Sequence, residues 1–549
     1  MNQPNRESTP IAPAPLLQRL FNRKQWPKYL FAVACLATLG ALLLTLGSRR
    51  NAQAQPNPGG AAVTSPERAA AEKIVPPPVP DDQNFAATPY FASLFDKATR
   101  SESDRRWPDD FSRADKWPRR FPILAESAEG RKTGRFVTDM FAWKMAFEKS
   151  QDVLRPSDTR DEFAVTDQPD PVTNAQAAVF VLEALKPYEP VLAELQAVRE
   201  RPHSRYNVRY TWENPWGILL PHLAVMKRTV QLLRLKASAE VAAGHSEQAR
   251  QDILLMLRLA DSNRDEPTLI SQLVRVAVLE IAFQPIWEGL AAQRWSDTQL
   301  QSLQAALQRY DFIADLKQCL EAEKVWGNLT IALFRDKQSP VSFSSLLSED
   351  GKVDDWVKEA DKAFASSPRD WFDAEQRNYN RIFDEYLLAG FDVAAKRVYP
   401  RVTDENMHRM EKTLGGKGTW VKDHFAFSRA FLPAMSRVHL KLAGTQGYAD
   451  LAVVACALER HRLANGQYPE ALAALAPRFV KAVPHDLVTG KSLQYRRTDD
   501  GRFVLYSVGW NEIDDNGELA FFASGRGPEK KDGDWVWRYP TPKTKVSFE

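Results

Sequence analysis

The stretch that decides the fold of the C-terminal part is Leu458-Glu459-Arg460-His461-Arg462-Leu463-Ala464-Asn465-Gly466-Gln467-Tyr468-Pro469. Apolar residues recur at roughly helical spacing from Leu451 to Leu463. Gly466 is placed to adopt the left-handed conformation of a helix C-cap, and Pro469 prevents the helix from restarting at once. We therefore expect a helix that ends at Asn465 and Gly466.

The residues that follow are typical of a small antiparallel sheet. Leu493 to Arg497 is a predicted strand, Asp499-Asp500-Gly501 a tight turn, and Phe503 to Val508 the returning strand. The connection from the helix contains Val483-Pro484-His485-Asp486-Leu487-Val488-Thr489-Gly490-Lys491. The sequence thus predicts a small α+β module at residues 446–549, in which a helix packs on a hairpin.

This order of elements resembles the C-terminal head of the major pseudopilin of type II secretion systems. In that family too, a helix ends at Asn-Gly-x-Tyr-Pro, and a Pro-x-Asp-x-x-x-Gly loop follows. A small antiparallel sheet then leads to an acidic, Gly-containing loop, which here is Asp514-Asp515-Asn516-Gly517. The resemblance is confined to residues 446–549 and implies the fold of a module, not the task of the whole chain.

The resemblance also implies a Ca²⁺ site. In the pseudopilin head, the loop after the last strand binds calcium, with one aspartate near its start and another beside a following tryptophan. Asp514 and Asp515 match the first position, and Asp534 looks like the second. Hard cations prefer clustered carboxylate and carbonyl oxygens, which Glu512 and Asn516 could supplement.

Two observations leave the calcium assignment open. Asp514-Asp515-Asn516-Gly517 can also be only a solvated turn. The loop before Asp534 is longer and more basic than the family pattern, and Lys530 and Lys531 would weaken cation binding.

The N-terminal region predicts a membrane anchor. Tyr29 to Gly47 is uncharged and dominated by Leu, Ala, Phe and Val, and about 20 apolar residues suffice to span a bilayer as a helix. Basic residues precede the run, which favours residues 1–28 on the cytoplasmic side and the bulk of the chain outside a bacterial inner membrane. The alternative is a signal peptide that is cleaved after Ala52-Gln53-Ala54. Either alternative departs from the pseudopilins, whose membrane helix lies directly before the head, behind a leader cut at a Gly-Phe-Thr-Leu-Ile-Glu motif that is missing here.

Residues 48–88 are rich in Pro, Gly and Ala and are a predicted linker, and residues 89–445 a predicted all-helical domain of antiparallel hairpins. The clearest hairpin runs from His222 to Ala260, with a break at Ala243-Gly244-His245. Ser296 and Asp297 are placed to cap the start of a later helix that runs through Leu307. The fold class is therefore mainly α, with a membrane helix, a linker, a helical domain and a small α+β C-terminal domain.

The composition excludes some functions and leaves others open. With 73 basic and 70 acidic residues the formal net charge is +3, which argues against a nucleic-acid partner. No His-Glu-x-x-His pattern, Cys/His metal cluster or Gly-x-Ser-x-Gly elbow occurs, although triads assembled from distant residues stay open. Glu321 and Glu323, two apart on a predicted helix, are expected to be solvated rather than an acid–base couple.

These observations favour a membrane-anchored, extracytoplasmic interaction or scaffold protein that binds an unidentified protein partner and has no catalysis of its own. An accessory component of a type II secretion or pilus-like apparatus is one alternative. An envelope hydrolase with a site in the helical domain is another. The overall plan resembles membrane-anchored proteins of the Planctomycetes and Verrucomicrobia type.

Overall fold

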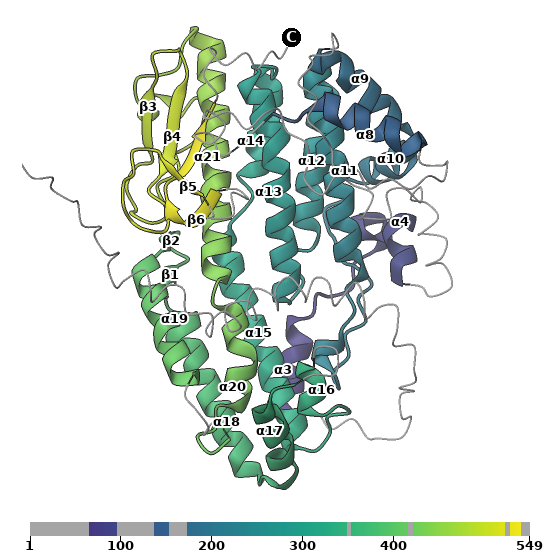
Figure 1. Ribbon diagram of the computed structural model, residues 1–549, viewed down its shortest axis with the longest axis vertical. Coiled ribbons are helices and arrows are strands. Elements are labelled where there is room, and N and C mark those ends of the chain that lie inside the picture. The colour runs from purple at the N-terminus through teal and green to yellow at the C-terminus, as the bar shows by residue number, and fades with distance from the viewer. Residues whose placement is uncertain are drawn as a thin grey trace, which may run out of the picture.

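The computed structural model describes residues 65–95, 135, 137–152, 173–348, 353–415, 421–521 and 528–539. The predicted cytoplasmic segment 1–28, the predicted membrane helix 29–47 and residues 48–64 of the predicted linker lie outside the described residues. The described part is mainly helical, with small sheets near the C-terminus, as the sequence predicts (Figure 1).

The helices and strands are, in chain order, α3 (Pro66–Ile74), α4 (Pro89–Ala92), α8 (Met140–Asp152), α9 (Asn174–Leu185), α10 (Glu189–Ala197), α11 (Pro221–Ala243), α12 (Ser246–Ser262), α13 (Leu269–Ala291), α14 (Asp297–Leu307), α15 (Phe312–Arg335), α16 (Phe343–Leu347), α17 (Asp355–Ser366), α18 (Arg369–Ile382), β1 (Phe391–Asp392), β2 (Arg397–Val398), α19 (Pro400–Leu414), α20 (Ala426–Phe431), α21 (Val438–Asn465), β3 (Gln494–Arg497), β4 (Phe503–Ser507), β5 (Leu519–Phe521), β6 (Pro528–Gly533) and β7 (Trp535–Arg538).

The predicted helical hairpin is confirmed. α11 ends at Gly244, whose φ of 83° is the left-handed conformation that glycine adopts without a steric cost, and α12 begins two residues later. The predicted start of α14 is also confirmed. Ser296 Oγ accepts from the peptide N–H of Gln299, whose side chain accepts in return from the peptide N–H of Ser296.

α13 lies in the middle of the helical body, where it packs against α11, α12 and α21. By length and composition it is the one helix among the described residues that could span a membrane, but 67% of its most apolar window is buried in the protein. It also carries the buried Arg275, which pairs with Asp315 of α15 and lies over the ring of Phe312 at 4.6 Å. α13 is therefore a helix of the protein core, which accounts for its burial and for the buried ion pair.

The C-terminal part shares a helix with the helical body. α21 runs without a break through residues 445 and 446, where we expected the domain boundary. Helices α13, α14 and α15 pack on it, and so do strands β4, β6 and β7. The expected division at this point is therefore replaced by one continuous helix between the body and the sheet (Figure 1).

The predicted strands are present as β3 and β4, joined by a turn in which Gly501 has a φ of 75°. The sheet has the order β3-β4-β7 and is antiparallel, with Tyr495 opposite Leu505 and Leu505 opposite Trp537. A second hairpin of β5 and β6, which the sequence reading did not include, lies beside it (Figure 1).

The predicted linker is folded from residue 65 onward. Ser65 caps α3 by accepting the peptide N–H of Arg68 at 3.1 Å, with Pro66 in the first helical turn. Glu67 then pairs with Arg335 of α15 at 3.1 Å. The expectation of a linker up to residue 88 is therefore wrong for residues 65–88, because a capped helix and ion pairs attach them to the body.

Candidate functional site

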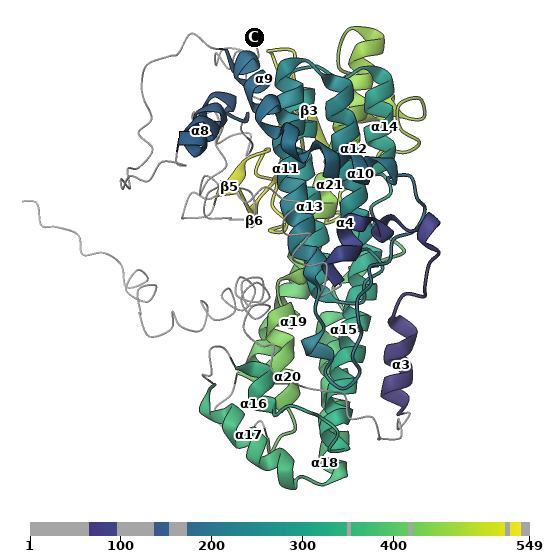
Figure 2. The same ribbon diagram turned by 90° about the vertical axis from the view of Figure 1, so that its right-hand side faces the viewer.

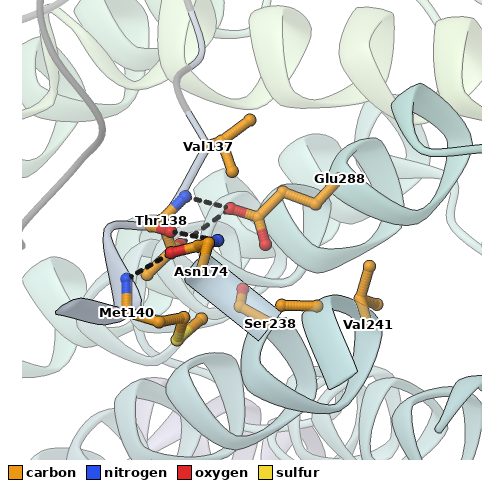
Figure 3. Close-up of a pocket in the computed structure, with 8 residues that line it drawn as sticks. Val137, Thr138, Met140, Asn174, Ser238, Val241 and Glu288 are labelled. Atoms are coloured by element: carbon orange, nitrogen blue, oxygen red, sulfur yellow. Dashed lines mark hydrogen bonds between the residues drawn. The ribbon is translucent and has the colours of Figure 1, made fainter. Parts of the chain in front are cut away.

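A small pocket lies where the segment before α8 meets α11 and α13 (Figure 3). Glu288 lines it, and its Oε1 accepts hydrogen bonds from the peptide N–H of Thr138 at 2.8 Å and from the Thr138 hydroxyl at 2.7 Å. Asn174 Oδ1 accepts from the peptide N–H of Met140 at 2.9 Å. The pocket has room for about one water molecule. Its polar groups therefore fasten the start of α8 to the body and do not form a substrate site.

A buried histidine–carboxylate pair joins α11 to the loop before α13. His222 Nε2 lies 2.7 Å from Glu266 Oε1, although the orientation does not meet hydrogen-bond geometry, and the imidazole stacks on Tyr206 with centroids 4.1 Å apart. Ser271 Oγ donates to the other carboxylate oxygen at 2.5 Å. His222 is fully buried and Glu266 nearly so. Because neither side chain reaches the surface, the pair is a core contact rather than a catalytic dyad.

Two other buried acids stabilise helix N-termini. Glu323 accepts the peptide N–H of Leu269 at the start of α13, and burial raises the pKa of Glu323 to about 7. Glu375 accepts the peptide N–H groups of Ala426 and Phe427 at the start of α20, and burial raises the pKa of Glu375 to about 8. The expectation that Glu323 is solvated is wrong. Glu323 is buried against the start of α13, where the first peptide N–H groups of the helix need an acceptor.

The structure brings the three predicted calcium ligands close together: Asp514 and Asp515 lie in the loop between β4 and β5, and Asp534 lies between β6 and β7. Asp534 is buried, and its two oxygens accept the peptide N–H groups of Asp515 at 3.3 Å and Gly517 at 2.6 Å. Burial raises the pKa of Asp534 to about 6, against the effect of these N–H groups. Asp514 Oδ1 accepts from the Tyr506 hydroxyl at 3.0 Å. The carboxylates thus organise the loop.

In the part of the chain that the structure describes, no group of three or more His, Cys, Asp or Glu side chains is arranged to hold a metal ion. Glu512, a predicted supplementary ligand, pairs instead with Arg401 of α19. Lys530 pairs with Glu280 of α13, and Lys531 lies 3.5 Å from Asp404 of α19. The two lysines therefore pair with acidic residues of the helical body. The sequence had suggested instead that their charges would weaken cation binding in the loop.

The Asp-x-x-x-Gly element has a structural role. The buried Asp486 accepts the peptide N–H groups of Val488 at 2.8 Å and Thr489 at 3.0 Å through one oxygen, and that of Val508 at 3.1 Å through the other. Gly490 closes the turn with a φ of 70°. Asp486 thereby ties this turn to the end of β4, where the acidic loop begins.

The acidic loop also presents an apolar side chain, which the sequence reading missed. Ile513 is 58% exposed, and Val402 of α19 is 45% exposed. The ion pair of Arg401 with Glu512 joins the residues directly before them, so both follow the point where α19 meets the acidic loop. We call Val402 and Ile513 the junction patch. A lone Ile among polar residues carries no periodic signal, so only the folded structure could reveal it.

Comparison with protein-family models, with curated proteins and with solved structures found no match to this chain.

Proposed function

We propose that this chain is an extracytoplasmic interaction protein, anchored in a bacterial inner membrane by Tyr29–Gly47, and that the junction patch is its contact surface for a protein partner. The observation that carries the proposal is the way in which the loop from Trp510 to Gly517 holds Ile513 outward. An exposed apolar side chain on a fixed backbone favours binding, because little conformational entropy is lost when a partner covers it.

Several contacts fix this loop. Trp510 Nε1 donates to Asp404 Oδ1 of α19 at 3.1 Å, and Glu512 pairs with Arg401. Glu512 has a φ of 61°, which costs a residue with a side chain about 1 kcal/mol. Local strain of this kind persists where surrounding contacts enforce it, and it is common at functional surfaces.

The position of the patch suits a partner outside the membrane. The chain enters the described part at Ser65, next to α3, whereas β5 and β6 lie on the other side of the body (Figure 2). If the anchor precedes α3, the C-terminal sheets are free to meet a partner away from the point of attachment.

Site-specific photo-crosslinking in the cells that make the protein tests the contact surface. A photoreactive residue at Ile513 is expected to give a discrete crosslinked species, which the additional substitution Val402→Asp should remove. The control position is Leu463 on α21, which is 43% exposed but lies outside the patch. Equal crosslinking at both positions, or none at Ile513, would contradict the proposal.

The anchor has its own test. The protein should stay with the membrane after an alkaline carbonate wash, and N-terminal sequencing should find residues before Tyr29. A mature chain that begins at Gln55 would show that the signal-peptide alternative is right.

A further inference from the structure

Fewer residues separate the described body from the predicted membrane helix than the sequence suggested. Because the described part begins at Ser65 rather than at residue 89, residues 48–64 are what remains between it and Gly47. At no more than about 3.5 Å per residue, these 17 residues span at most about 60 Å. If Tyr29–Gly47 is the membrane helix, the face of the body that carries α3 lies within this distance of its end.

α3 is held on one part of α15. Glu67 pairs with Arg335, and Arg68 lies over the ring of Trp212 at 6.0 Å. Trp212 in turn stacks on Trp326 of α15. α3, which follows the predicted linker (here called the tether, residues 48–64), and the loop that carries Trp212 thus contact the same part of α15.

Two large apolar side chains are exposed on this same loop. Trp216 is 39% exposed and Leu219 is 64% exposed. The Trp216 indole is fixed, because its Nε1–H donates to Thr330 Oγ1 at 2.8 Å and its ring stacks on Phe431 with centroids 4.6 Å apart. Thr330 and Arg335 are five residues apart on α15, or about 7.5 Å along the helix axis. Trp216 therefore contacts α15 less than one and a half turns from the residue that holds α3, and Leu219 follows three residues later.

We propose that Trp216 and Leu219 form a lipid-contact site that rests in the interface of the bilayer in which the chain is anchored. The inference rests on the proposed function, since it requires the anchor. Tryptophan favours the membrane–water interface, where its ring meets apolar chains and its N–H stays near polar groups. Two such side chains bind a bilayer weakly on their own, but a short tether raises the local concentration of the surface enough to populate the contact.

The contact also fixes an orientation. With α3, Trp216 and Leu219 toward the lipid, the hairpin of β5 and β6 faces away from it, because it lies on the other side of the body (Figure 2). The lipid-contact site would thereby keep this hairpin available to a partner.

Depth-dependent quenching of an environment-sensitive fluorophore tests the site. The full chain carries Cys35→Ser and Leu219→Cys, is labelled with the fluorophore NBD, and is reconstituted into vesicles of three parts phosphatidylcholine to one part phosphatidylglycerol. Cys319 and Cys456 are buried and react poorly. The matched control carries the label at Val179→Cys on α9, which is 56% exposed and far from α3 in both views (Figures 1 and 2).

Lipids with a nitroxide near the headgroup should quench the label at position 219 by about two-fold or more, because an interfacial side chain lies within about 5–10 Å of the headgroup boundary. They should leave the label at position 179 unchanged. Trp216→Ser in the Leu219→Cys chain should reduce the quenching at position 219.

Three results would overturn the inference. If the chain stays with the vesicles but the label at position 219 is quenched no more than that at position 179, the anchor stands and the lipid contact does not. If the label at position 219 is shielded from aqueous iodide but not quenched by the lipids, protein covers the site instead. If carbonate releases the chain, the anchor itself fails, and the lipid contact fails with it.

Discussion

Gly447→Ala is expected to loosen the C-terminal sheet from α21. A Cβ at this position would lie 2.4 Å from Cε3 and 2.8 Å from Cζ3 of Trp535. The Trp535 ring is buried, and its Nε1–H donates to the backbone oxygen of Lys530 at 3.0 Å. The ring therefore cannot move by the required distance, about 1 Å, without losing packing or this hydrogen bond.

The expected magnitude is the difference between two opposing effects. Replacing a helical glycine by alanine favours the helix by about 1 kcal/mol. Forcing an extra methyl group into a filled core costs about 1–3 kcal/mol, and weakening the Trp535 hydrogen bond costs about 1 kcal/mol more. We therefore expect the sheet to be destabilised by about 1–3 kcal/mol relative to α21.

Gly444→Ala is the matched control on the same helix. Its Cβ would meet Cδ of Lys530 at 2.7 Å, but this atom belongs to a flexible chain that can turn aside. The gain in helix propensity should then offset most of the cost.

Hydrogen exchange by mass spectrometry measures the effect locally, in peptides that cover β4 and β7. Because opening free energies set exchange rates, Gly447→Ala should raise exchange there about 5- to 150-fold, and Gly444→Ala much less. Unchanged or slower exchange in the Gly447→Ala protein would refute the argument that the sheet presses directly on α21.

Two further predictions concern buried carboxylates. The folded-state pKa of Glu323 is about 7, above the ordinary 4.5, so between these two pH values the folded state retains a proton that the unfolded state releases. The contribution of this proton to the free energy of unfolding is complete below pH 4.5. It is lost as the pH rises to 7, by up to about 1.4 kcal/mol per pH unit. Urea unfolding between pH 5 and 7 should show a shallower pH dependence in Glu323→Gln than in Glu321→Gln, whose exposed carboxylate serves as the control; equal slopes would contradict the assignment. Calcium binding stays a prediction: millimolar Ca²⁺ should raise the melting temperature by mass action, and Asp534→Ala should abolish the rise and also cost about 1–3 kcal/mol without calcium, because it leaves two peptide N–H groups without their acceptor. No shift with calcium in the wild-type protein would leave Asp514-Asp515-Asn516-Gly517 as an organised turn only.

The elements that the sequence predicted well are those with local signals. The hairpin break at Gly244 and the helix end at Gly466 both adopt left-handed backbone, with φ values of 83° and 78°. The start of α14 at Ser296 follows from a capping box whose two partners lie three residues apart. Such features need no knowledge of the rest of the fold, because the atoms involved are neighbours in the chain.

Where the sequence reading failed, distant residues decided the outcome. Glu323 is buried because the start of α13 lies over it, and no pattern around residue 323 contains that information. α21 runs on through residues 445 and 446 because it is covered by helices along one side and by the sheet along another, which no local pattern records. α3 is an intermediate case, since Ser65-Pro66-Glu67 is a helix start, but its stability comes from Arg335.

The same dependence on distant residues decides how the calcium prediction must be tested. Lys530 is held by Glu280 and Lys531 by Asp404, and both acids belong to the helical body rather than to residues 446–549. In an isolated C-terminal fragment these ammonium groups would lose their partners, and their charges would add to the field at the acidic loop, which disfavours a cation. A negative result in the fragment would therefore say nothing about the whole protein. Only the full chain retains the charges that the loop experiences, and the calcium titration belongs there.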